Sequence, residues 1–151
     1  MAGRSAVRHV LERSVILKFG EENEMKIAAL IARLLLGLIF VVFGLNGFLH
    51  FIPMGPMPSG LAGQFIGALF QSHYVLVVSA LQVAGGVLLL VNRYVPLGLV
   101  LLGPVIVNIL LFHLLMDPKG LPLAIIVVIL WGVVALRHRQ SFSGIFVQRA
   151  S

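Results

Sequence analysis

Four long apolar runs constrain the fold of this chain more than any other feature. They extend over residues 27–50, 74–91, 94–116 and 121–136. A helix that crosses a bilayer needs about 20 predominantly apolar residues, so the first three are long enough or nearly so, and the fourth needs flanking residues. Apolar residues make up 60% of the chain and charged residues 11%, which is outside the range of soluble proteins. We therefore predict an all-α integral membrane four-helix bundle.

A fifth, shorter helix is predicted between the first two runs. Residues 51–60 contain three prolines and two glycines, which exclude a regular helix there. Ser59 then stands where it could cap a helix over residues 60–71. That segment is too short to span a membrane, so we expect it to lie in the membrane interface or to dip into it.

The chain divides into one membrane domain and two flanking segments. The membrane domain covers residues 25–140, and residues 141–151 form a C-terminal tail. Residues 1–24 carry mixed charge with weak amphipathy, which is typical of either a surface helix or a disordered arm. Met25 is followed directly by Lys26 and an apolar run, which resembles an ordinary start of a membrane protein. We therefore regard residues 1–24 as a dispensable extension.

The distribution of lysine and arginine predicts the orientation in the membrane. These residues concentrate before the first run, between the second and third runs, and after the last. The positive-inside rule then places both termini in the cytoplasm, with Asn92 and Arg93. Arg33 lies close enough to this face for its side chain to extend back to the headgroups, so all three are expected to anchor the cytoplasmic face. Because the cationic residues flank apolar runs, the net charge of +6 does not indicate nucleic-acid binding.

Several polar residues lie inside the runs or at their ends, mostly toward the outer side. A polar group in hydrocarbon costs free energy unless it is hydrogen-bonded, so these residues are either packing devices or parts of a site. Pro104 is expected to bend the third helix, and Asn108 and His113 are expected to point in different directions, about 140° apart. The candidate polar cavity comprises Asn46, His50, Gln82, Asn108, His113 and Asp117.

These residues leave several alternatives open. A quinone-like ring could bind with its oxygens on His113 and on Asn108 or Gln82. His50 and His113 could instead ligate a haem, although two histidines are weak evidence for one. In a purely structural interpretation, the amide side chains form hydrogen bonds between helices, and the histidines lie among the lipid headgroups. A small-solute carrier is weaker, because no acidic residue lies near the middle of a run. The chain has no cysteine, which excludes disulfides and thiolate metal sites, and we expect no metal site.

Three segments resemble the DoxX family of small bacterial membrane proteins. They read RLLLGLIFVVFGLNGF (33–48), LQVAGGVLLLVNRYVPL (81–97) and PVIVNILLFHLLMDPKGL (104–121). The resemblance implies a four-helix bundle in the bacterial inner membrane, in a family named from a subunit of a thiosulfate:quinone oxidoreductase. It carries the family's polar pattern onto the candidate residues Arg33, Asn46, Gln82, Asn92, Arg93, Asn108, His113 and Asp117. Gly47 stands where relatives often have lysine, and Gln82 where some have glutamate, which removes charge from the proposed cavity.

We therefore expect an accessory or small-molecule-binding subunit of a membrane redox system, and no catalysis by the isolated chain. Its expected partners are the lipid bilayer and redox-complex subunits. A scaffold without a ligand and a small-solute carrier are the alternatives.

Overall fold

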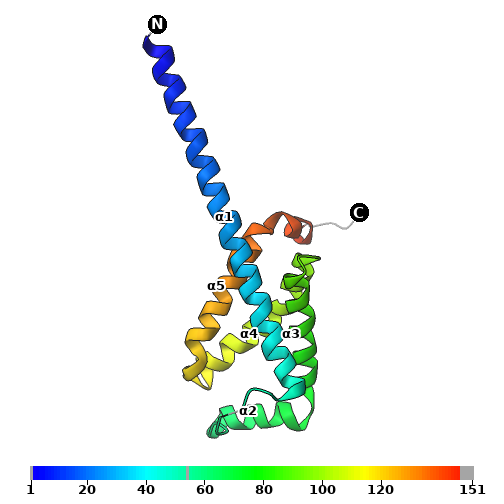
Figure 1. Cartoon of the computed structure of the whole chain (residues 1–151). Coiled ribbons are helices and arrows are strands. Elements are labelled where there is room, and N and C mark those ends of the chain that lie inside the picture. The colour runs from blue at the N-terminus through cyan, green and yellow to red at the C-terminus, as the bar shows by residue number, and fades with distance from the viewer. Residues whose placement is uncertain (1, 54, 147–151) are drawn as a thin grey trace.

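A computed structural model describes residues 2–53 and 55–146, and these residues form helices joined by short connections (Figure 1). No strand occurs among them. The α-helices are α1 (Ala2–Leu49), α2 (Gly60–Gln71), α3 (Tyr74–Leu90), α4 (Val95–Leu115) and α5 (Leu121–Arg137), and the 3₁₀ helices are η1 (Pro118–Gly120) and η2 (Arg139–Phe146). The all-α prediction is confirmed.

Four helices pack into a bundle whose outer surface is apolar. α1 contacts α3 and α5, and α4 contacts the same two helices. The centre of the bundle contains the fully buried side chains Leu36, Phe40, Leu89, Leu99, Leu102 and Val134. On the outside, Leu38, Val100 and Ile129 are each more than half exposed. A soluble bundle would place polar residues at such positions, so this surface is suited to contact with lipid.

Three helical segments of the described chain are long and apolar enough to cross a membrane. They are Glu22–Leu49, Val95–Leu115 and Pro118–Arg137. α3 has 17 residues and meets the same criteria only together with α2, from which it is bent by 83°. The chain thus has three candidate spans, or four if the bent pair counts as one, which indicates a multi-pass membrane protein. The last candidate span begins at Pro118, because η1 precedes α5 directly and adds its three residues to the shortest apolar run.

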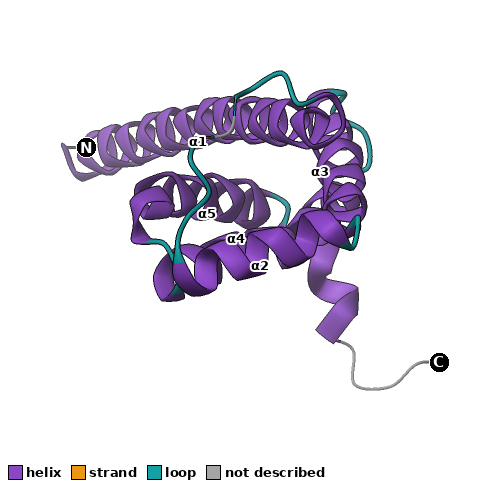
Figure 2. Cartoon of the chain, turned by 90° about the horizontal axis from the view of Figure 1, so that it is seen from below, coloured by secondary structure: helices purple, strands orange, loops and turns teal. Residues whose placement is uncertain are grey.

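α2 lies across one end of the bundle (Figures 1 and 2). Its bounds are those predicted, but the predicted cap is wrong. Ser59 occupies the N-cap position without a side-chain capping bond. Gly60 follows with a φ of 67°, so the first turn lacks the right-handed geometry that directs its N–H groups to a capping side chain.

Glycines allow α1 and α3 to touch through their backbones. A Cβ atom added to Gly86 would lie 2.8 Å from the carbonyl oxygen of Gly37. Further along the same interface, a Cβ atom on Gly47 would collide with the side chain of Ser79. Small residues at this interface thus allow the two helices to approach closely, as is common in membrane bundles.

Helical structure extends into both segments that flank the predicted membrane domain. α1 continues without a break through the expected junction between residues 24 and 25, and its N-terminal part projects from the bundle (Figure 1). η2 occupies the start of the predicted tail, and residues 147–151 lie outside the described residues.

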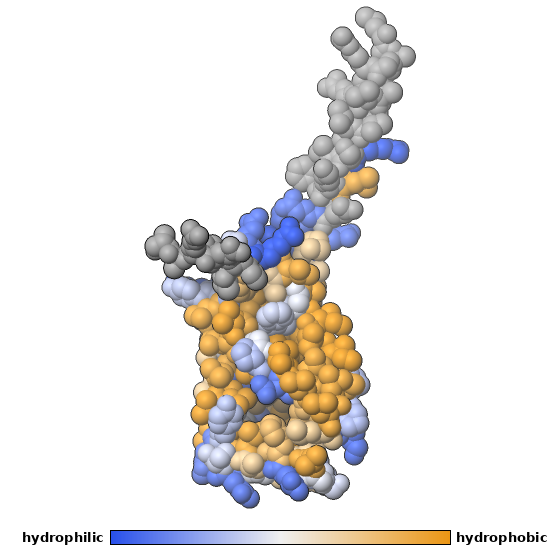
Figure 3. Space-filling view, turned by 180° about the vertical axis from the view of Figure 1, so that it is seen from behind, coloured by the Kyte–Doolittle hydropathy of each residue, from blue (hydrophilic) through white to orange (hydrophobic). Residues whose placement is uncertain are grey.

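The two ends of the bundle differ in character. The N-terminal part of α1, η2 and the turn between α3 and α4 lie at one end, which we call the basic end (Figure 1). Its cationic residues include Lys26, Arg33, Arg93, Arg137 and Arg139. α2 and η1 lie toward the opposite end, which we call the α2 end. Figure 3 shows hydrophilic surface gathered at both ends of an apolar body, and a hollow in that body toward the α2 end.

Candidate functional site

Two neighbouring cavities lie toward the α2 end of the bundle. The central cavity has a volume of about 240 Å³ and is enclosed by α1, α3, α4, η1 and α5. The α2 cavity has a volume of about 300 Å³ and lies between α2, α3 and α4. The central cavity is lined by Ile39, Phe40, Phe43, Gln82, Ile109, His113, Gly120, Leu123, Ala124 and Val127. The α2 cavity is lined by Phe65, Ile66, Leu69, Tyr74, Val78, Leu81, Pro104, Val105, Asn108, Ile109, Phe112 and His113.

His113 and Ile109 border both cavities. Gln82 adds a second polar side chain to the central cavity, and Asn108 and Tyr74 add theirs to the α2 cavity. Apolar and aromatic walls with few polar groups are typical of sites for small apolar ligands. Asn108 and His113 were expected to face different directions, yet both border the α2 cavity, because this cavity extends around the side of α4.

A hydrogen bond to the backbone determines which ring nitrogen of His113 carries the proton. Its Nδ1 atom lies 2.8 Å from the backbone carbonyl oxygen of Asp117. A carbonyl can only accept, so this bond assigns a proton to Nδ1. In the neutral ring Nε2 then carries the lone pair. His113 therefore offers an acceptor, not a donor, to a bound molecule.

Close packing holds the same ring in place. A Cβ atom added to Gly120 would collide with the imidazole, at 2.5 Å from Nε2 and 2.7 Å from Nδ1. The ring of Phe112 meets the imidazole edge-on at a centroid distance of 5.1 Å, and Phe65 of α2 lies 5.7 Å from Phe112. η1, α4 and α2 thus form one continuous set of contacts around His113.

Asn108 does not act as the interhelical link that the structural reading predicted. Its side-chain Nδ2 donates to the carbonyl oxygen of Pro104 in the same helix, at 2.9 Å. The amide Oδ1 and the second N–H remain on an exposed surface that borders the α2 cavity. Near the same proline, Trp131 Nε1 donates to the Leu99 carbonyl oxygen at 3.0 Å, which ties α5 to α4.

Asn46 and His50 terminate α1 and line neither cavity. The Oδ1 atom of Asn46 accepts a hydrogen bond from the backbone N–H of Ile52 at 2.7 Å. His50 is exposed, has a φ of 51°, and donates its backbone N–H to the Asn46 carbonyl at 2.9 Å. These hydrogen bonds satisfy polar groups at the C-terminal end of α1. The structure therefore does not bring His50 and His113 to a common cavity, as an axial haem pair would require.

Asp117 supports the site through its backbone and caps η1 with its side chain. Its carbonyl orients His113, and its Oδ1 accepts from the Lys119 backbone N–H at 3.4 Å. No group of three or more metal-ligating side chains occurs in the described part of the chain.

Arg33 makes a specific contact to α3. It is buried, with 8% exposure, and its guanidinium donates to the carbonyl oxygens of Leu89 and Leu90 at the end of α3, the second at 3.4 Å. The C-terminal end of a helix favours a positive charge, so this contact is a favourable one, and the predicted anchoring at the cytoplasmic face stays a prediction. Asn92 and Arg93 are exposed in the turn that follows.

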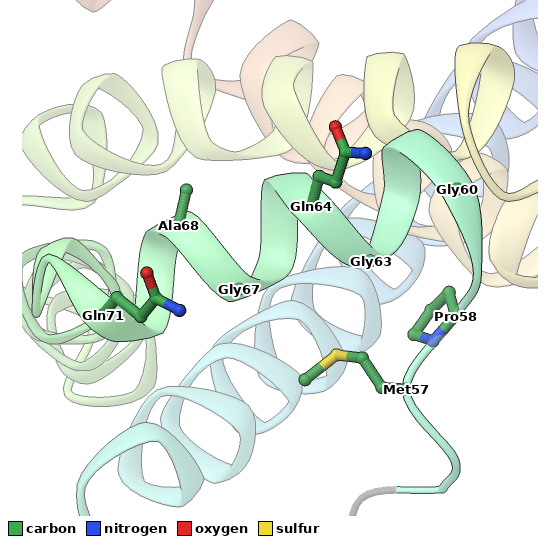
Figure 4. A pocket seen from close by; sticks show the side chains of 8 residues that line it. All are labelled: Met57, Pro58, Gly60, Gly63, Gln64, Gly67, Ala68 and Gln71. Atoms are coloured by element: carbon green, nitrogen blue, oxygen red, sulfur yellow. The ribbon is translucent and has the colours of Figure 1, made fainter.

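A third hollow covers the loop side of α2 and has a volume of about 530 Å³ (Figure 4). It carries two polar side chains, Gln64 and Gln71, beside small residues of α2, with Met57 and Pro58 on the loop. No charged side chain lines it.

Sequence reasoning did not identify Gly120, Phe65 or Trp131. The motif DPKG indicates a turn but not which ring packs against its glycine. Trp131 is the single tryptophan of the chain, and this rarity was the only feature of the sequence that could have drawn attention to it. The partners of all three lie on other helices, so no spacing along the chain indicates them.

The chain matches no known family model, no curated protein and no solved structure. The resemblance to the DoxX family therefore stays a prediction from the three segments given above.

Proposed function

We propose that this chain is a DoxX-like small-molecule-binding subunit of a membrane redox system in the bacterial inner membrane, and that its ligand is a quinone-type ring. The observation that carries this proposal is the position of His113. Its imidazole borders two apolar cavities, and its Nδ1–H is already occupied by the Asp117 carbonyl.

The hydrogen-bonding groups favour the reduced, hydroxyl-bearing form of such a ring. Nε2 of neutral His113 can accept a hydrogen bond from a quinol hydroxyl but cannot donate one to a quinone carbonyl. Gln82, in the same central cavity, can donate or accept through its amide. Volumes of about 240 and 300 Å³ are suited to a ring and not to a long isoprenoid tail.

Binding of a short-chain quinol to purified protein in lipid nanodiscs tests the proposal. The single tryptophan, Trp131, provides an intrinsic fluorescence signal that a bound ring quenches. His113→Ala removes one hydrogen bond to the ligand and should weaken binding about tenfold. Gln82→Leu should weaken it as well. His50→Ala is the matched control, because His50 lines neither cavity.

Equal quinol affinity in wild type and His113→Ala would contradict the proposal. So would stronger binding of the quinone than of the quinol, because the assigned tautomer predicts the opposite order. Solvent extraction of freshly purified protein, followed by mass spectrometry, should recover a bound quinol or quinone from the wild type and less from His113→Ala.

The projecting part of α1 favours a second candidate, a scaffold that holds a partner subunit. α1 extends beyond the bundle at the basic end (Figure 1). A scaffold predicts that deletion of residues 1–21 releases a co-purifying partner while quinol binding is unchanged. A carrier predicts solute flux in proteoliposomes, and neither of the other roles does.

A further inference from the structure

A fourth hollow lies at the basic end, between α1 and the end of α5. Its volume is about 540 Å³, within the range of about 300–1,000 Å³ that is typical of ligand pockets. We call it the basic pocket. Its charged lining residues are Glu22, Lys26, Arg137 and Arg139, and its apolar ones include Met25 and Leu136.

Among the described residues, one cationic side chain of the basic pocket has an ion-pair partner and two have none. Lys26 Nζ lies 2.9 Å from a carboxylate oxygen of Glu22, so this cation is already paired. Neither Arg137 nor Arg139 has an ion-pair partner within the part of the chain that the structure describes. Burial lowers the pKa of the adjacent His138, and Arg137 and Arg33 lower it further, so this histidine is uncharged at neutral pH. Two guanidinium groups therefore supply the cationic charge that is not held in an ion pair, although Lys26 and, to a smaller extent, the nearby Arg137 lower the pKa of the Glu22 carboxyl.

The apolar residues of the pocket indicate where the ligand comes from. Met25 is 59% exposed and Leu136 is 66% exposed. Both lie at the ends of candidate spans, where the acyl chains of a bilayer begin. A free inorganic anion gains nothing from such surface, whereas a phospholipid presents a phosphate and apolar chains together.

We propose that the basic pocket binds an anionic phospholipid, with its phosphate on Arg137 and Arg139 and its acyl chains against Met25 and Leu136. Arginine forms bidentate hydrogen bonds with phosphate oxygens, and basic pockets between helices at the membrane surface suit anionic headgroups. If these cations only set the orientation in the membrane, then only their number at this end matters. If they bind a lipid, then the affinity depends on which of them line the pocket.

That difference defines the test. Native mass spectrometry of the detergent-solubilised full chain measures the binding of phosphatidylglycerol, phosphatidylcholine and inorganic phosphate. Arg139→Gln should lower phosphatidylglycerol affinity about fivefold. The matched control Arg93→Gln removes the same charge at the same end, outside the pocket, and should change affinity by less than about twofold.

A second pair of variants tests the site through a gain of affinity, which a misfolded protein cannot give. Glu22→Gln releases Lys26 from its ion pair and should strengthen phosphatidylglycerol binding. Glu24→Gln removes the same charge outside the pocket and should leave it nearly unchanged. Equal effects within either pair of variants would overturn the proposal. So would equal binding of phosphatidylcholine, or full displacement of the lipid by inorganic phosphate, which would identify a soluble-anion site.

Discussion

At the residue scale, the orientation of His113 depends on a glycine that lacks a side chain. The imidazole fits against Gly120 only because no Cβ atom is present there. The hydrogen bond from Nδ1 to the Asp117 carbonyl then selects the tautomer. A turn of the backbone thus decides which ring nitrogen carries the proton.

Gly120→Ala should displace the imidazole and destabilise the protein by about 1–3 kcal/mol, the usual cost of overpacking. Quinol binding should fall with it. Thermal unfolding in detergent and the tryptophan quenching assay measure the two effects. Gly132→Ala is the control, because a Cβ atom at that position meets nothing within 4 Å. This variant should be neutral or stabilising, since alanine is the better helix former. Equal losses in both variants would contradict the packing argument.

The lowered pKa of His138 predicts that the stability of the folded protein depends on pH. Its pKa in the folded protein is lowered from the ordinary 6.5, first by burial and then by Arg137 and Arg33. Below pH 6.5 the unfolded chain therefore binds more protons than the folded one, so stability falls as the pH falls through this value. The melting temperature should be lower at pH 5.5 than at pH 7.5. His138→Gln should reduce that difference, and an unchanged difference would exclude His138 as its source.

At the element scale, α1 and α3 are joined by backbone contact and by one buried cation. Gly37 and Gly86 let the two backbones approach, and Arg33 closes the end of α3 by donating to the Leu89 and Leu90 carbonyls. The last carbonyls of a helix lack intrahelical donors, and here the guanidinium supplies a donor in addition to the Asn92 N–H, which lies 3.3 Å from the Leu89 oxygen. The interface therefore needs both small residues and a specific charge.

Arg33→Met should destabilise the bundle by about 1.5–3 kcal/mol, because it removes the hydrogen bonds from a charged donor to the Leu89 and Leu90 carbonyls. Unfolding by sodium dodecyl sulfate, followed by circular dichroism, measures the loss. Arg93→Met is the control for charge, because Arg93 is exposed, and it should change stability by less than about 0.5 kcal/mol. A similar loss in the control would show that net charge, not the contact to α3, is responsible.

At the scale of the whole molecule, the fold separates the two functions that we propose. The two cavities that border His113 lie toward the α2 end, and the basic pocket lies at the opposite end, between α1 and the end of α5. The positive-inside rule assigns the basic end to the cytoplasm. The proposed lipid site would then lie in the cytoplasmic leaflet, and the proposed ring site would lie toward the opposite face.

Single cysteines test this orientation cleanly, because the natural chain contains none. Lys119→Cys places a thiol on exposed η1, and Ser143→Cys places one on exposed η2. In intact spheroplasts a membrane-impermeant maleimide should label the first, and label the second only after the membrane is opened. The cysteine-free parent gives the background. The reverse pattern would invert the topology, and labelling of both would contradict an arrangement with these segments on opposite faces.

The sequence by itself determined the class and the elements of this protein. Apolar runs longer than about 16 residues predict membrane helices because only a helix satisfies its own backbone in hydrocarbon. The prolines and glycines of residues 51–60 likewise predicted where α2 begins. These are local effects of composition and backbone chemistry, so they can be read along the chain.

The tertiary structure decided which polar residues belong together. It brings Gln82, Asn108 and His113 to the cavities and leaves Asn46 and His50 at a helix end. It also buries Arg33 against α3 and places Arg137 and Arg139 around a shared hollow. Each outcome depends on the rotation of one helix about its axis relative to another. That rotation is set by the packing of glycines and large side chains from distant segments, which no spacing within one helix specifies.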